Sequence, residues 1–215
     1  MSSTTNPKPA ARAAAGGEQP RRADARRNRE AVLVAARDQF GRFGLDCQMA
    51  DIAREAGVGV GTVYRHFQTK DELIAALVTD RFQRLADRAM QALGEDDPWR
   101  AFCDLMRFAA ELQVRDRGLS QFLSSQPRLA EREAVQSGLA TAMAELMAAA
   151  QRAGGMRQDA VVEDVPTLIC ALGAVMAGAA DSLASRNWKR FVEIMLDGLR
   201  APGENELPPS RRAIG

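Results

Sequence analysis

The chain has 215 residues, of which 46% are hydrophobic, enough for a core in one large domain or two small ones. Its net charge of +1 gives no overall sign of a nucleic-acid partner. Cys47, Cys103 and Cys170 lie far apart without metal-ligand spacing or a disulfide framework, which predicts a reducing cytoplasm and no metal or other cofactor. The longest uncharged stretch, 165–180, is shorter than the ~18–20 residues of a membrane span, so we expect no membrane partner.

The charge is distributed unevenly along the chain. Residues 1–29 carry seven basic and two acidic side chains, a net charge of +5, which leaves −4 for the remainder. Residues 1–23 contain few large apolar side chains, so we predict a disordered basic arm there. Such an arm on a mildly acidic body suits a protein that places one end on a polyanion, although a solvated tail with no partner would have the same composition.

A first helix is predicted from Asp24, a good N-cap, to Gly44. Arg26, Arg27 and Arg29 fall in its first turns, where cations oppose the helix dipole. Nearby phosphates would explain this placement, and an exposed basic turn without a partner is the alternative. The apolar side chains of the helix recur at helical spacing and should face inward: Val32, Leu33, Ala36 and Phe40, with Phe43 closing the end.

The segment from Met49 to Lys70 reads MADIAREAGVGVGTVYRHFQTK. Its first part has apolar residues at spacings of three and four, and Gly57 follows where a helix end favours left-handed backbone. A second short helix is predicted from Gly59 or Val60 through Phe67. Two short helices joined by a tight turn, the second carrying polar and basic side chains, form the helix-turn-helix arrangement, whose second helix enters the DNA major groove.

These residues also carry a family resemblance. The run DIAREAGVGVGTVYRHFQTKDELI resembles the N-terminal signature of the tetracycline-repressor (TetR) family of bacterial regulators. The chain departs from the signature at Gln48, where many members have Ser or Thr as a helix cap, and at Gly59, where Ser is frequent. The matching positions are Ile52-Ala53, Ala56-Gly57-Val58, Gly61-Thr62-Val63-Tyr64, His66-Phe67 and Lys70.

The resemblance implies a homodimeric all-α protein. Residues 24–69 would form the three-helix DNA-binding domain with the helix-turn-helix. Residues 70–200 would form a C-terminal helical domain for effector binding and dimerisation, followed by a flexible tail at 201–215.

The expected DNA contacts are of two kinds. Phosphate contacts position the protein, and base-edge contacts select the sequence. Arg65 is the only long basic side chain on the second helix of the motif, so we predict that it binds a guanine or a phosphate. Gly61 would let the backbone approach DNA, or serve only the geometry of the helix start. The predicted DNA-binding residues are Arg26, Arg27, Gln48, Val60, Gly61, Thr62, Tyr64, Arg65, His66 and Lys70.

The remaining chain shows helix patterns and no strand pattern. Thr69 and Glu72 have the spacing of a capping box that opens a helix from Lys70 to about Leu93. Asp97 would cap the next helix, with Pro98 at its first position. Further helices are predicted over 99–116, 118–125, 127–152, about 163–183 and 188–199.

The middle helices combine sulfur-containing and aromatic side chains, which suit an apolar effector pocket but are equally typical of plain core. The predicted pocket residues are Phe102, Cys103, Met106, Phe122, Met143 and Met147. The last two helices would form half of a four-helix dimer seam, or else remain ordinary core helices. The predicted seam residues are Leu168, Leu172, Val175, Met176, Ala179, Trp188, Phe191, Met195 and Leu199.

The leading hypothesis is a homodimeric repressor, bacterial, cytoplasmic and nucleoid-associated, which a small apolar effector releases from a palindromic operator in double-stranded DNA. An activator, or a ligand-independent DNA-binding regulator of the same fold, is the alternative. An enzyme is disfavoured, because the chain has one histidine, unpaired cysteines and no catalytic constellation. The glycines of 57–61 follow a charged, helix-periodic segment and not the buried strand that precedes a nucleotide-binding loop.

Overall fold

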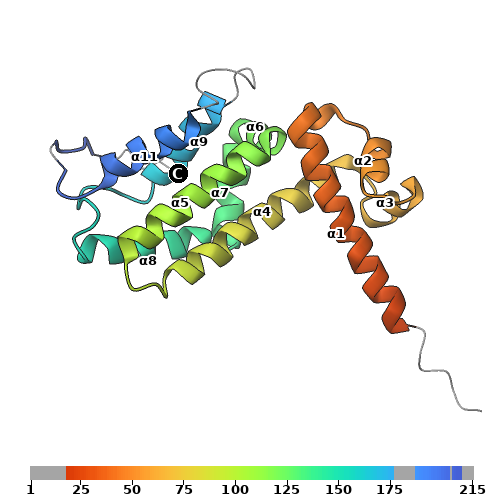
Figure 1. Cartoon of the computed structure of the whole chain (residues 1–215), viewed down its shortest axis with the longest axis horizontal. Helices are drawn as coiled ribbons and strands as arrows, with labels where there is room; N and C mark the ends of the chain where they lie inside the picture. Colours follow the sequence, from red (N-terminus) through yellow and green to blue (C-terminus); the bar gives the residue numbers. More distant parts are fainter. Residues whose placement is uncertain (1–17, 177–186, 204, 210–215) are drawn as a thin grey trace, which may run out of the picture.

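The computed structural model describes residues 18–176, 187–203 and 205–209, and it confirms the predicted all-α fold (Figure 1). Among these residues, the β-type pairing consists of one isolated bridge between Met156 and Arg200. A short 3-10 turn, Gly44–Asp46, follows the first helix. The helices are α1 (Glu18–Phe43), α2 (Met49–Glu55), α3 (Val60–His66), α4 (Lys70–Ala92), α5 (Pro98–Arg115), α6 (Arg117–Ser125), α7 (Pro127–Gln136), α8 (Leu139–Arg152), α9 (Asp164–Met176) and α11 (Trp188–Leu199).

The helices α1, α2 and α3 form one end of the molecule, and α4 runs from that end into a body built from α5 to α11 (Figure 1). A first hydrophobic cluster joins α1, α2 and α3 to the start of α4, with Val32, Ile52, Val63 and Leu77 fully or almost fully buried. A second cluster holds α4, α5, α8, α9 and α11 together. The helix α4 therefore contributes to both cores.

Two predicted helix caps position α4 and α5. The Thr69 hydroxyl accepts a hydrogen bond from the Glu72 amide at 3.1 Å, while the Glu72 carboxylate accepts one from the Gln68 amide at 2.7 Å. The Asp97 carboxylate accepts from the Arg100 amide at 3.0 Å, with Pro98 at the first position of α5. These bonds satisfy amides that have no partner inside the helix, so both helices begin where the sequence indicates.

The start of α1 and the side chain at its end differ from prediction. The helix begins at Glu18 instead of Asp24. Asp24 lies within the helix, where its carboxylate pairs with Arg27 three residues later. Phe43 does not close the end: its side chain is exposed, and Leu45 packs against the first cluster instead. The left-handed backbone of Gly44 (φ 72°) turns the chain at this point.

The single helix predicted over 127–152 is in fact two helices. They are separated at Gly138, whose φ of 80° lies in the left-handed region that other residues rarely adopt. The break lets α7 leave the axis of α8, and α7 then forms a wall of the cavity described below. Gly138 thus ends one helix and starts the next.

The helix α6 packs backbone to backbone against α1. A Cβ atom added at Gly118 would lie 2.5 Å from the Phe40 carbonyl oxygen and 3.4 Å from the Gly44 Cα atom. A Cβ added at Gly41 of α1 would lie 2.8 Å from the carbonyl oxygen of Arg115, the last residue of α5, so the backbone just before α6 is also close to α1. Leu119, next to Gly118, is buried in the first cluster. The body of the protein therefore rests directly on α1 through α6.

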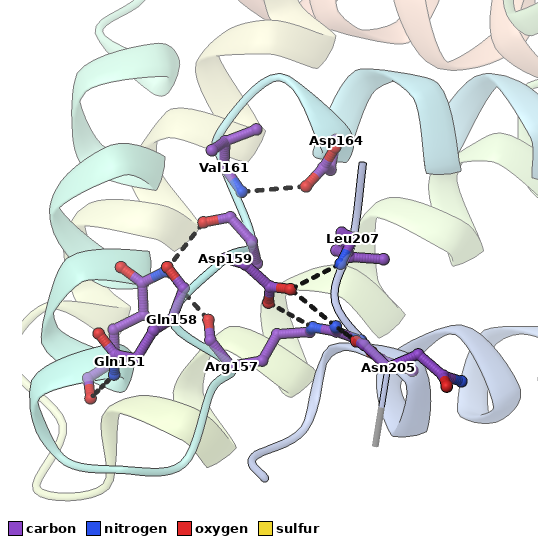
Figure 2. Close-up of polar contacts among 10 residues, drawn as sticks. Gln151, Arg157, Gln158, Asp159, Val161, Asp164, Asn205 and Leu207 are labelled. Carbon is purple, nitrogen blue, oxygen red and sulfur yellow. Dashed lines mark hydrogen bonds and ion pairs between the residues drawn. The ribbon is translucent and has the colours of Figure 1, made fainter. Parts of the chain in front are cut away.

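The segment after α11 is tied to the loop between α8 and α9 (Figure 2). Arg157 donates hydrogen bonds to both carboxylate oxygens of Asp159, at 2.6 and 2.8 Å, and to the Gly198 carbonyl oxygen at 3.1 Å. It also contacts the Asn205 carbonyl oxygen, and the Leu207 amide donates to Asp159 at 2.9 Å. The Arg157–Asp159 pair thus fastens residues 205–207, part of the predicted flexible tail, to the body.

This pair predicts a specific pH dependence of stability. The Arg157 guanidinium and the Leu207 amide hold the pKa of Asp159 well below its usual range. The pair therefore contributes stability that is fully present above the unfolded-state pKa of about 3.9 and is lost as the pH falls towards the folded-state pKa. We expect Asp159→Asn to lower the melting temperature at pH 7, and the difference from the unaltered protein to shrink below about pH 4.

Thermal unfolding followed by circular dichroism between pH 7 and pH 3 measures this effect. Asp96→Asn is the matched control, because Asp96 is an exposed loop aspartate for which the structure shows no side-chain partner. A melting-temperature difference for Asp159→Asn that stayed constant over this pH range would contradict the assignment.

Candidate nucleic-acid interface and ligand cavity

The outer face of α3 is the exposed surface of the helix-turn-helix. Gly57, with φ 65°, turns the chain between α2 and α3, and Val63 and Phe67 anchor the inner face of α3 in the first cluster. The opposite face is therefore directed to solvent. Of the predicted contact residues on it, Val60, Gly61, Tyr64 and Arg65 are exposed, and Thr62 and His66 are half-buried.

Arg65 has the reach and the freedom to contact DNA. One of its guanidinium nitrogens, Nη2, donates a hydrogen bond to the Thr62 hydroxyl at 3.2 Å, and this leaves its remaining donors available to a base or phosphate. A Cβ built at Gly61 or at Gly59 meets nothing within 4 Å. The start of α3 is therefore open to a close approach by another backbone.

The flanking predicted residues lie at three places around α3. Gln48, the N-cap residue of α2, makes no cap hydrogen bond and donates instead to the Asp46 carbonyl oxygen at 3.2 Å. Its side chain is exposed. Lys70 is half-buried in the first turn of α4, directly after α3. Arg26 and Arg27 are exposed on α1, and Arg27 pairs with Asp24.

Arg29 belongs with these residues, although it was predicted only as part of the basic first turns of the helix and not among the DNA-binding residues. Its guanidinium carbon lies 5.1 Å from the centre of the Phe67 ring, which places a cation beside the end of α3. Arg26 lies one helical turn earlier on α1. The sequence signal for Arg29 was its place within the same basic run.

A cavity of about 230 Å³ lies in the body, lined by residues of α4 to α9. Of the six predicted pocket residues, Met106 and Met143 line it. The other four do not line it: Phe102, Cys103 and Met147 are buried in the second cluster, and Phe122 packs against the first. Burial raises the pKa of Cys103 to about 11, so this thiol is inert core.

A polar group at the cavity was not predicted at all. Arg81 is only 5% exposed, and its Nη1 donates to the Ser120 hydroxyl at 2.9 Å, while Nη2 contacts the Gln113 side-chain oxygen. Gln113 donates onward to the Ile169 carbonyl oxygen at 3.3 Å. All three side chains line the cavity. The sequence signal was a charged residue inside the apolar stripe of α4, four residues after Leu77.

The predicted dimer seam needs a correction. Leu172 and Leu199 are buried within the single chain, which leaves them no surface for a partner. Leu168, Trp188, Phe191 and Met195 are half-buried. The side chains of Val175 and Met176 and the whole of Ala179 lie outside the described residues. Ile194, which was not predicted, is 58% exposed, because it faces away from Val192 and Leu196 on α11.

Other kinds of site find no support in the described part of the chain. Within it, no three His, Cys, Asp or Glu side chains come together in a way that would hold a metal ion. None of the described helices combines the length and the apolar character that crossing a membrane requires.

Comparison with known proteins agrees with this geometry. Residues 32–77 match the family described as bacterial regulatory proteins, tetR family, and residues 97–201 match the SbtR-like transcriptional regulator C-terminal domain. The crystal structure of a TetR transcription regulatory protein from Mycobacterium vanbaalenii is 37% identical, with a TM-score of 0.63, and the alignment covers 85% of this chain and 100% of that one. The chain belongs to the TetR family of transcriptional regulators.

Two further relatives match the chain over different lengths. The TetR transcriptional regulator SCO0520 from Streptomyces coelicolor is 29% identical with a TM-score of 0.63, over 81% of this chain and 99% of that one. The HTH-type transcriptional regulator SAR0097 from Staphylococcus aureus is 33% identical over 81 residues. That match covers 37% of this chain and 42% of the relative. The family assignment identifies a DNA-binding regulator with a helix-turn-helix, and not an enzyme.

Proposed function

We propose that this TetR-family regulator is a homodimeric repressor that binds a palindromic operator in double-stranded DNA and is released by a small-molecule effector. One observation carries the effector-release part of the proposal. The cavity is lined by Arg81 of α4 and Ser120 of α6, and these are the helices that extend into the DNA-binding core. A ligand in the cavity therefore touches the two elements whose positions determine where α1, α2 and α3 lie.

Release requires that the effector bind two states of the protein with different affinity. We infer that the DNA-bound state and the effector-bound state differ in the position of α4 and α6 against α1. Two recognition helices in a dimer must lie about 34–36 Å apart to enter successive major grooves on one face of DNA. A small rotation of α4 in each subunit would change this separation and weaken operator binding.

The dimer is part of the proposal because one half-site gives few contacts. We propose that the outward faces of α9 and α11 form the seam, with Ile194 and the half-buried Phe191 and Met195 meeting their counterparts. The DNA-binding residues are those predicted on α1, α2, α3 and the start of α4, together with Arg29. The site of action is the bacterial cytoplasm, at the nucleoid.

The DNA-binding part is tested by fluorescence anisotropy with DNA from the region upstream of the protein's own gene, over a salt series. We expect tight binding that falls steeply with salt, because released counterions drive phosphate contacts. Arg65→Ala should cost about 1–3 kcal/mol on the cognate site if it reads a base. Lys70→Ala should weaken binding to all sequences and reduce the salt slope by about one.

Arg128→Ala is the matched control, because Arg128 is exposed on α7, away from the helix-turn-helix, and should leave binding unchanged. Binding to neither the upstream DNA nor a random DNA library at low salt would overturn the proposal. Specific binding that no ligand alters would favour the alternative, a ligand-independent regulator.

A further inference from the structure

The cavity has a floor and walls of opposite character. Arg81, Gln113 and Ser120 form a buried polar floor and are each about 5% exposed. The walls are apolar, with Phe82, Leu85, Leu105, Met106 and Leu139 among the lining residues. Exposed residues of α6, α7 and α9, including Ser124, Glu131 and Cys170, form the mouth. A ligand that fits must therefore be apolar along its length and polar at its inner end.

The charge at the floor is positive and has no ion-pair partner close by. Among the described residues, no carboxylate oxygen lies within 4.0 Å of the Arg81 guanidinium nitrogens. Asp116 exerts an attraction from farther away, and Arg84 opposes it. Burial dominates and lowers the pKa of Arg81 to about 10, which still leaves the side chain charged at neutral pH.

A buried cation of this kind is strongly stabilised by an anion that enters the same site. Hydrogen bonds between a guanidinium and a carboxylate are about twice as strong as neutral ones, and the planar donor group of arginine matches the two carboxylate oxygens. The hydrogen bonds from Arg81 to Ser120 and Gln113 hold its side chain in place before a ligand arrives. The floor thus holds the cation in a fixed position at the inner end of the cavity.

The size of the cavity limits the rest of the ligand. An engineered protein cavity of about 150 Å³ holds benzene. A cavity of about 230 Å³ therefore has room for one ring with a short substituent, or for a short aliphatic chain. Glu131 at the mouth is exposed, so water screens its repulsion of an entering acid.

We propose that the effector is a small monocarboxylic acid with an apolar body, bound with its carboxylate on Arg81 at the floor of the cavity and its body along the walls of α4, α5 and α8. This assignment rests on the proposed function only for the release step, since binding of the acid does not require DNA. It also revises the predicted effector, which was described only as small and apolar.

The position of Arg81 connects this chemistry to DNA release. A carboxylate on the guanidinium competes with Ser120 and Gln113 for its donors, and Ser120 lies next to Leu119 and two residues after Gly118 on α6. A Cβ added at Gly118 would lie 2.5 Å from a backbone oxygen of α1, so this residue packs directly on that helix. The acid therefore acts on the contact between body and DNA-binding end through a chain of adjacent residues.

Isothermal titration of the full-length protein, without DNA, tests the ligand class. The probes are benzoate and hexanoate, each paired with its neutral amide of nearly the same shape, benzamide and hexanamide. We expect the acids to bind at least about tenfold more tightly than the amides, because only they form the charge-assisted bonds. Arg81→Met should remove this preference while leaving amide binding little changed.

A second variant, Arg81→Lys, keeps the test decisive if Arg81→Met does not fold. Arg81→Lys keeps the charge but loses the two-pronged geometry, so it should retain acid binding with reduced affinity. Amides that bind as tightly as acids, or acids that bind Arg81→Met as tightly as the unaltered protein, would overturn the proposal. So would the absence of heat from either acid at millimolar concentration.

The operator assay separates this proposal from the proposed function. Acids that bind through Arg81 and release DNA support both. Acids that bind through Arg81 but leave operator binding unchanged support the ligand class and contradict the release mechanism. A neutral ligand that releases DNA without needing Arg81 supports the repressor and overturns the assignment of an acid.

Discussion

Replacement of Ile194 by glutamate is expected to leave the single chain folded but to separate the dimer and abolish operator binding. Ile194 lies on the outer face of α11, opposite the buried Val192 and Leu196, and is 58% exposed in the single chain. A charge is harmless at such a position when water covers it. At a dimer seam the same charge would be buried without a partner, which costs several kcal/mol in each subunit.

The expected outcome is a dimer dissociation constant raised by more than about a hundredfold. Sedimentation equilibrium measures it directly, and circular dichroism checks the fold of the variant. Operator affinity should fall in parallel, because a single subunit contacts only one half-site.

Met90→Glu is a closely matched control. Met90 is 62% exposed on α4, and Asp87 lies three residues before it, just as Asp197 lies three residues after Ile194. It lies outside the proposed seam and should remain dimeric. If Ile194→Glu remained a dimer as well, the seam would have to lie on another face of the molecule.

Replacement of Gly118 by alanine is expected to destabilise the protein by roughly 1–3 kcal/mol or more, although the same change inside a helix normally stabilises by about 0.5–1 kcal/mol. The added Cβ would lie 2.5 Å from the Phe40 carbonyl oxygen and 3.2 Å from its carbonyl carbon. These are backbone atoms in the last turn of α1, so no side chain can move aside. The whole of α6 would have to shift relative to α1.

Denaturation by urea, followed by circular dichroism, gives the free energy of unfolding. A loss of 1 kcal/mol should lower the melting temperature by roughly 2–4 °C for a chain of this size. Gly61→Ala is the control for stability, because its Cβ meets nothing within 4 Å. A Gly118→Ala protein as stable as the unaltered one would show that α1 and α6 can move apart at little cost in free energy. That result would argue against the α1–α6 contact as the route by which the effector signal reaches the DNA-binding end.

The DNA-binding end was the most predictable part of the fold. The spacing of Met49, Ile52 and Ala53, the turn at Gly57 and the capping pair Thr69–Glu72 are local signals, and they predict α2, α3 and the start of α4 to within about a residue. Such signals need no knowledge of the rest of the chain. The exposed face of α3 then follows from which residues are apolar.

The ligand cavity was much less predictable, for two physical reasons. An apolar residue on a helix faces inward whether it meets a tightly packed neighbour, as Phe102 does, or an open space, as Met106 does. The difference depends on how neighbouring helices pack. The break at Gly138 was also hidden, since a glycine within a helical pattern adopts either sign of φ, and only the fold selects the left-handed one.

Arg81 carried a signal that helical periodicity alone could not interpret. Its position in the apolar stripe of α4 indicates burial, but burial of a cation requires partners. Those partners, Gln113 and Ser120, lie 32 and 39 residues away on other helices.

The packing of α6 and α8, which links the hydrophobic clusters of the two ends, also determines how the molecule unfolds on heating. Leu139 at the start of α8 contacts every hydrophobic cluster of the described chain, and Leu119 of α6 belongs to the cluster that surrounds the helix-turn-helix. The boundary between the DNA-binding end and the ligand-binding body therefore does not separate two units that unfold independently. Calorimetry should show one transition for both ends, and a ligand bound in the body should raise the temperature at which α1, α2 and α3 lose their structure.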